Sequence, residues 1–129
     1  MTRPPIKRSD RKAKDVLLIE SPSSARERHA KTLVRNGYNV FTADTIEDAR
    51  TQFAPQRFGL LVLSLNGFGE KGAQLCNEIK EVDGKQVIAM IFHPDQELPA
   101  TDCPTLIFTT EPDEYFLARV ETLTATAYA

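Results

Sequence analysis

Short strand-like segments rich in apolar residues recur along this chain, separated by segments with apolar residues at helical spacing. They are DVLLIE (15–20), YNVFTA (38–43), FGLLVLSL (58–65), QVIAMIF (86–92) and TLIF (105–108), and the first of them is a continuous apolar run between polar flanks. A continuous apolar run between polar flanks is typical of a strand buried on both faces of a parallel sheet. Because helical segments separate the runs, we predict an α/β fold with a doubly wound, five-stranded parallel sheet and right-handed crossovers.

The first expected helix follows the first apolar run. Ser21 is its expected N-cap, with Pro22 at the first helical position, and Gly37 is its expected C-terminal stop. Its expected apolar face consists of Ala30, Leu33 and Val34.

Three further helices are expected, at 45–54, 72–82 and 111–125. In the first, Thr45 precedes Asp48 by three residues, which is close to a capping box. The inward residues are expected to be Ile46, Ala49 and Phe53 in this helix, and Phe116, Val120 and Leu123 in the last one, which has Asp113 near its start. The segment 93–104 has three prolines in twelve residues, so we expect a helix there to be short or absent.

Composition favours a single soluble domain. The chain has 129 residues, of which 41% are hydrophobic and 26% are charged, and its longest apolar runs are too short to span a membrane. The beginning of the chain lacks the apolar core of a secretory signal, so we expect a cytoplasmic protein. Cys76 and Cys103 form no metal-binding spacing with His29 or His93, and we expect reduced thiols and no cofactor.

Charge divides the chain into two parts. Residues 1–14 contain six Lys or Arg residues and one Asp, a net charge of +5, so the remaining residues carry −7 of the total of −2. We predict a disordered basic tail over 1–14 and a folded domain over 15–129. The tail is either an arm for nucleic acid or an acidic partner, or a solubilising leader, and it has no interleaved aromatic residue for base stacking.

A glycine-rich stretch follows the third apolar run. Gly67, Gly69 and Gly72 have the spacing G-x-G-x-x-G, and Asp95 lies 23 residues after the last of them. This spacing can form a dinucleotide-binding loop at a helix N-terminus. Such a loop normally opens the fold, whereas two complete strand–helix units precede this one. We therefore favour a flexible glycine-rich turn and keep a small-ligand site over 67–72 as the alternative.

In order and spacing, three stretches of the chain resemble the receiver domain of bacterial response regulators. They are VLLIESPSSARERHAKTLVRNGYNVFTADT, RFGLLVLSLNGFGEKGAQLCNEIKE and TTEPDEYFLARVETL. The resemblance covers residues 15–123 and implies a flavodoxin-like, CheY-like fold. It also implies a role in two-component signal transduction, in which a histidine kinase passes a phosphoryl group to an aspartate.

The residues that the family needs for this chemistry are replaced here. The resemblance places the magnesium-holding acidic pair on Glu20 and Ser21, the phosphoacceptor on Ser64, the hydroxyl residue on Ile91 and the lysine on Glu111. Magnesium prefers hard carboxylate oxygens, a serine needs an activating base, isoleucine donates no hydrogen bond, and a glutamate would repel a phosphoryl group. We therefore expect a degenerate receiver domain without catalytic or metal-binding residues.

Glu20 and Glu111 are expected at the same end of the sheet. They are either a repurposed cation site or coupled pair, or two solvated carboxylates, one of them paired with Lys71 or capping an amide. We favour the solvated carboxylates.

These observations predict a phosphorylation-independent protein–protein interaction module. The chain is expected to be a stand-alone domain, because only the basic tail precedes the first strand and the chain ends after the last helix. We expect a signalling protein as partner, a monomer or weak homodimer, no membrane contact, and nucleic acid only through the tail. The candidate interaction surface consists of His93, Asp95, Glu97, Phe108 and Tyr115.

Overall fold

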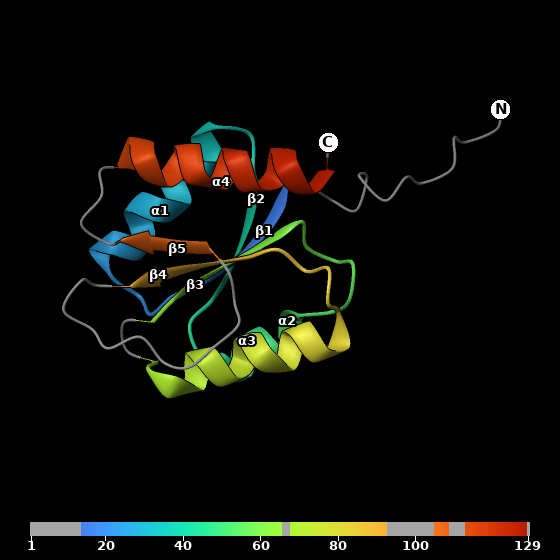
Figure 1. Ribbon diagram of the computed structural model, residues 1–129. Helices are drawn as coiled ribbons and strands as arrows, with labels where there is room; N and C mark the ends of the chain where they lie inside the picture. Colours follow the sequence, from blue (N-terminus) through green and yellow to red (C-terminus); the bar gives the residue numbers. More distant parts are fainter. Residues whose placement is uncertain (1–13, 66–67, 93–104, 109–112, 129) are drawn as a thin grey trace, which may run out of the picture.

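A computed structural model describes residues 14–65, 68–92, 105–108 and 113–128 of the chain (Figure 1). Its elements, in chain order, are β1 (Asp15–Ile19), α1 (Ser24–Arg35), β2 (Asn39–Ala43), α2 (Ile46–Gln52), β3 (Leu60–Ser64), α3 (Glu70–Val82), β4 (Ile88–Phe92), β5 (Thr105–Phe108) and α4 (Asp113–Tyr128). The strands form one parallel sheet in the order β2-β1-β3-β4-β5. The predicted doubly wound parallel sheet is confirmed. The prediction of a short or absent helix over 93–104 lies outside the described residues.

The sheet separates two hydrophobic layers, because successive side chains of a strand point to opposite faces. Figure 1 shows α1 and α4 on one face and α2 and α3 on the other. Leu17 and Ile19 of β1 belong to the α2/α3 layer, while Val16 and Leu18 belong to the α1/α4 layer. Both faces of the central strands are therefore buried, which explains their unbroken apolar runs.

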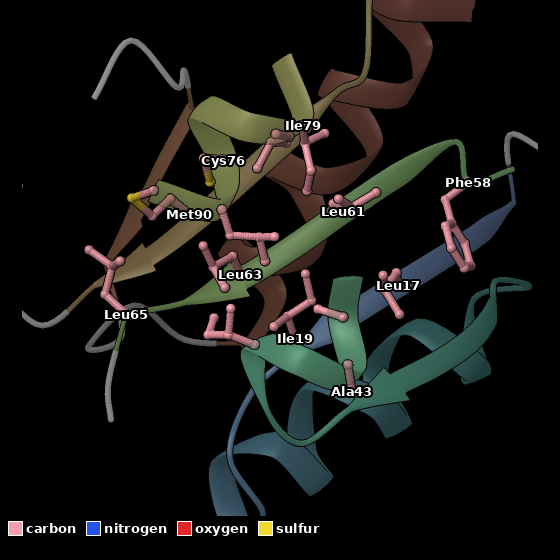
Figure 2. Close-up of a cluster of buried hydrophobic side chains, with 14 of the residues drawn as sticks. Leu17, Ile19, Ala43, Phe58, Leu61, Leu63, Leu65, Cys76, Ile79 and Met90 are labelled. Carbon is pink, nitrogen blue, oxygen red and sulfur yellow. The ribbon is translucent and has the colours of Figure 1, made fainter. Parts of the chain in front are cut away.

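The α2/α3 layer is the larger cluster of the two. In Figure 2, Leu61 and Leu63 of β3 lie among side chains from β1, α3 and β4, including Ile79 and Met90. Cys76 is buried in this layer as a thiol rather than in a disulfide, whereas Cys103 lies outside the described residues.

Two predictions about α1 are wrong. The N-cap is Ser23 rather than Ser21, because the Ser23 side chain accepts a hydrogen bond from the Arg26 backbone N–H at 3.1 Å. Val34 is 58% exposed, and the buried residues of the helix are His29 and Leu33. The helix is therefore rotated relative to the apolar face expected from the sequence, with a histidine facing the core.

The other described helices agree with the sequence pattern. The Thr45 side chain caps α2 by accepting a hydrogen bond from the Asp48 N–H at 3.0 Å. In α4, Phe116 and Val120 are buried and Leu123 is partly buried against them, as predicted. Within the described ranges, no helix combines the length and the apolar character needed to cross a membrane.

Candidate functional site

The carboxyl ends of β1, β3 and β4 bring three of the predicted site positions together. Ile19 pairs in register with Leu63, and Ser64 pairs with Ile91. Glu20, one residue beyond Ile19, is therefore next to Ser64 on the neighbouring strand. All three positions are buried: Glu20 is 5% exposed, Ser64 1% and Ile91 0%. Ser21 is only partly buried, and Glu111 lies outside the described residues.

The side chain of Glu20 is held inside the molecule by α1. His29 Nδ1 lies 2.9 Å from Glu20 Oε1, and each side chain is only 6% exposed. The backbone N–H of Glu20 donates to the Ala43 carbonyl at 3.1 Å. The preferred expectation of a solvated carboxylate, or of one paired with Lys71, is thus wrong for Glu20. Burial of an ionisable group is costly without a partner, and His29 is the partner supplied here.

The imidazole of His29 also contacts α4. Its ring centroid lies 4.7 Å from that of Phe116, with the two ring planes inclined at 37°. His29 therefore joins three elements, β1 through Glu20, its own helix and α4 through Phe116. This role of His29 was not predicted from the sequence, although His29 is four residues before the buried Leu33 and so lies on the same helix face.

A second carboxylate at this edge is also engaged by α1. Asp44 directly follows β2, and its carboxylate forms a salt bridge with the guanidinium of Arg26. The acidic residues that directly follow β1 and β2 are thus both paired with side chains of one helix. In the part of the chain that the structure describes, no group of three His, Cys, Asp or Glu residues could hold a metal ion.

Ser64 offers little reactivity at the end of β3. Its hydroxyl oxygen is buried and has no hydrogen-bond partner among the described residues. A serine hydroxyl becomes a good nucleophile when a neighbouring base activates it. The adjacent Ile91 is apolar and fully buried. The described part of this edge therefore presents a buried hydroxyl and an aliphatic side chain where the resemblance implies an acceptor and a hydrogen-bond donor.

Backbone conformation and packing explain the two glycines of the glycine-rich stretch that the structure describes. Gly69 precedes α3 with φ of +54°, a left-handed conformation that favours glycine. A Cβ atom at the buried Gly72 would lie 3.2 Å from Leu65 Cδ2 and 3.3 Å from Leu63 Cδ2. Gly72 therefore permits close packing of α3 on the sheet, which supports the turn interpretation. Gly67 lies outside the described residues.

Of the predicted interaction surface, the structure places one side chain. Tyr115 is 58% exposed on α4. Phe108 ends β5, and its side chain is not among those described; His93, Asp95 and Glu97 lie outside the described residues.

The predicted tail is described only at its last residue. Lys14 is exposed, with its ammonium nitrogen 4.2 Å from the centroid of the Tyr38 ring. Residues 1–13 lie outside the described residues, so the nucleic-acid alternative for the tail stays a prediction.

Comparison with known proteins gives matches at the level of structure. No protein-family model and no curated protein matches the chain. NtrX from Brucella abortus, solved with ADP, superimposes with a TM-score of 0.76 at 19% identity over 88% of this chain, which spans 26% of the NtrX chain. A CheY-like response regulator receiver domain from Methanospirillum hungatei gives a TM-score of 0.74 at 11% identity, covering 88% of this chain and 94% of that one.

A third similar structure is a complex of the histidine kinase ThkA with the response regulator TrrA. One chain of that complex matches with a TM-score of 0.72 at 19% identity. The match covers 84% of the present chain and 97% of the matched chain. The chain has the receiver-domain fold. The resemblance seen in its sequence is thereby supported at the level of fold, while the identities are too low to carry over function.

Proposed function

We propose that this chain is a receiver-type signalling module that works through contacts with another protein and transfers no phosphoryl group. The observation that carries the proposal is the buried pair of Glu20 and His29. In a phosphate-accepting receiver, the acid at this position holds magnesium near the phosphoryl group. Here the corresponding carboxylate is directed to a helix and covered.

The remaining positions support the same proposal. Magnesium keeps near-octahedral oxygen coordination and relies on carboxylate charge, which a serine at position 64 does not supply. Ile91 cannot stabilise charge on a phosphoryl oxygen. Each of these changes removes a separate requirement of phosphoryl transfer, so restoring one of them is not sufficient.

The expected partner is a signalling protein that recognises the receiver fold by its surface. One of the similar structures contains a histidine kinase together with a response regulator, which is precedent for such a contact on this fold. Tyr115, an aromatic residue of the predicted surface, is exposed on α4. Aromatic residues are enriched at protein interfaces because they bury a large area at low entropic cost.

An NMR titration of the full chain with magnesium and beryllofluoride, a phosphoryl mimic, tests the absence of phosphoryl chemistry. We expect no saturable shift at the amides of Glu20, Ser64 and Ile91. A matched variant, Ser64→Asp, restores the acceptor acid alone, and we expect it to stay unresponsive because His29 still holds Glu20. Saturable shifts at these amides in the unchanged chain would refute the proposal.

Affinity capture from the source cells tests the interaction itself. The unchanged chain, Ser64→Ala and Tyr115→Ala would be compared as baits, each with its fold checked by circular dichroism. We expect Ser64→Ala to retain the captured signalling partner and Tyr115→Ala to lose most of it. Loss of the partner with Ser64→Ala would contradict a phosphorylation-independent contact.

A further inference from the structure

A cavity lies at the opposite end of the sheet from Glu20 and Ser64. It has a volume of about 310 Å³ and is lined by Lys14, Tyr38, Glu121, Thr124 and Ala125. Lys14 directly precedes β1, and Tyr38 directly precedes β2, so both mark the amino ends of strands. Figure 1 shows the C-terminal part of α4 beside the beginning of β1, where these residues meet.

The cavity brings together two opposite charges that are not paired with each other. No salt bridge joins Lys14 or Glu121 to any residue in the described ranges. The ammonium of Lys14 is instead held above the face of the Tyr38 ring, 4.2 Å from its centroid. This cation–π contact places the positive charge at the cavity while leaving its hydrogen-bond donors available.

Hydroxyl groups line the same cavity. Tyr38 is only 4% exposed, and its hydroxyl lies 3.4 Å from Thr124 Oγ1, at the long limit for a hydrogen bond between oxygens. Thr124 Oγ1 also donates to the Val120 carbonyl at 3.1 Å, which fixes its position on α4. Because the Thr124 hydrogen is used in that bond, the Tyr38 hydroxyl donates to Thr124, and this long hydrogen bond can be exchanged for one to a ligand that offers a better acceptor.

We propose that this cavity binds a small zwitterion of the amino-acid class. The ligand carboxylate would accept hydrogen bonds from the Lys14 ammonium and the Tyr38 hydroxyl, while the ligand ammonium would donate to the Glu121 carboxylate. The volume is at the lower end of the range found for small-molecule sites, which suits a ligand of this size. Both charged side chains are exposed, so affinity is modest and falls as salt is added.

The proposal is independent of the interaction function, because it uses residues at the other end of the sheet. Ligand binding at this cavity would give the protein a way to respond to a small molecule, in place of the phosphorylation that we propose it lacks. Occupation of the cavity would bridge the start of β1 to α4, the helix that also carries Tyr115.

The test is an NMR titration of the full chain near neutral pH with three matched compounds. L-alanine carries both charges, N-acetyl-L-alanine carries only the carboxylate, and L-alanine amide carries only the ammonium. We expect saturable shifts at Tyr38, Thr124 and Ala125 with L-alanine, and binding of the other two to be weaker by about tenfold or more, since each lacks one charge-assisted hydrogen bond.

Two charge-removing variants sharpen the test. Lys14→Met should weaken the binding of L-alanine and N-acetyl-L-alanine. Glu121→Gln should weaken the binding of L-alanine and L-alanine amide. Lys71→Met and Glu114→Gln make the same chemical changes at exposed positions outside the cavity and should leave binding unchanged. The absence of saturable shifts at the cavity, equal binding of all three compounds, or unchanged binding in both cavity variants would overturn the proposal.

Discussion

Glu20 and His29 form a buried pair, with Oε1 and Nδ1 2.9 Å apart and each side chain 6% exposed. The pair links the carboxyl end of β1 to α1, and the His29 ring extends the link to Phe116 of α4. An acidic residue at the carboxyl end of a sheet strand is therefore part of the interior of this protein.

Removing both members of the pair should cost less stability than the losses of the two single variants added together. We expect His29→Leu to lower the free energy of unfolding by about 3 kcal/mol, because it leaves the Glu20 carboxylate buried without a partner. The double variant Glu20→Leu with His29→Leu should lose clearly less than the sum of the two single variants. Urea denaturation of all four proteins measures this cycle, and strictly additive losses would show that the two side chains do not depend on each other.

Alanine substitutions at two neighbouring residues of α4 should differ sharply in their effect on the free energy of unfolding. Phe116 is 2% exposed against His29, while Tyr115 is 58% exposed. We expect Phe116→Ala to cost about 3–4 kcal/mol of unfolding free energy through lost burial and a residual cavity. Tyr115→Ala serves as the matched control and should change the value by less than about 0.5 kcal/mol. Similar losses in both variants would mean that α4 packs on the sheet with a different face.

Gly72 should tolerate no larger side chain, because Leu63 and Leu65 already lie against it. We expect Gly72→Val to destabilise the protein by about 2 kcal/mol, since the added carbons would push α3 away from the sheet. At Gly84, a Cβ atom would have its nearest neighbour, the Lys80 carbonyl oxygen, at 3.7 Å, an ordinary contact. Gly84→Ala should therefore be nearly neutral in thermal denaturation, and an equal loss at both sites would contradict the packing role of Gly72.

The ion pair between α2 and α3 should give a small pH dependence. Glu78 accepts two hydrogen bonds from the Arg50 guanidinium, each 3.0 Å long, and this contact lowers the pKa of Glu78 below its ordinary value of 4.5. Because the folded-state pKa is the lower one, the stabilisation is fully present above pH 4.5 and is lost as the pH falls through the folded-state pKa.

The measurement compares the midpoint of urea denaturation at neutral pH with the midpoint at a pH well below 4.5, the ordinary pKa of Glu78. Glu78→Gln should narrow the difference between the two midpoints, and added salt should reduce the effect, since both side chains are about half exposed. Glu81→Gln is a control at an exposed position of the same helix, outside the pair of Arg50 and Glu78. An unchanged midpoint difference in Glu78→Gln would show that the pair is too well solvated to matter.

Much of the fold could be predicted from local patterns. The apolar runs at 15–20, 58–65 and 86–92 correspond to strands buried on both faces, and burial is the physical cause of such runs. Thr45 was found as an N-cap because its side chain acts within one helical turn. The end of α1 at Gly37 was likewise readable, since the residue has φ of +90° and glycine adopts it without strain.

Features that depend on contacts between residues far apart in the sequence could not be predicted from local patterns. Val34 was expected in the core, but α1 turns His29 inward because Glu20 and Phe116 receive it from β1 and α4. The helix is capped by Ser23 rather than Ser21, and three residues separate Glu20 from the first residue of α1.

Local patterns were enough to predict the succession of strands and helices along the chain and the burial of β1, β3 and β4 on both faces. Those properties follow from local periodicity and from side-chain chemistry. The burial of Glu20 against His29 and the cavity shared by Lys14 and Glu121 became visible only in the folded chain. Such pairings depend on the direction of side chains brought together from separate elements, and no local pattern records that direction.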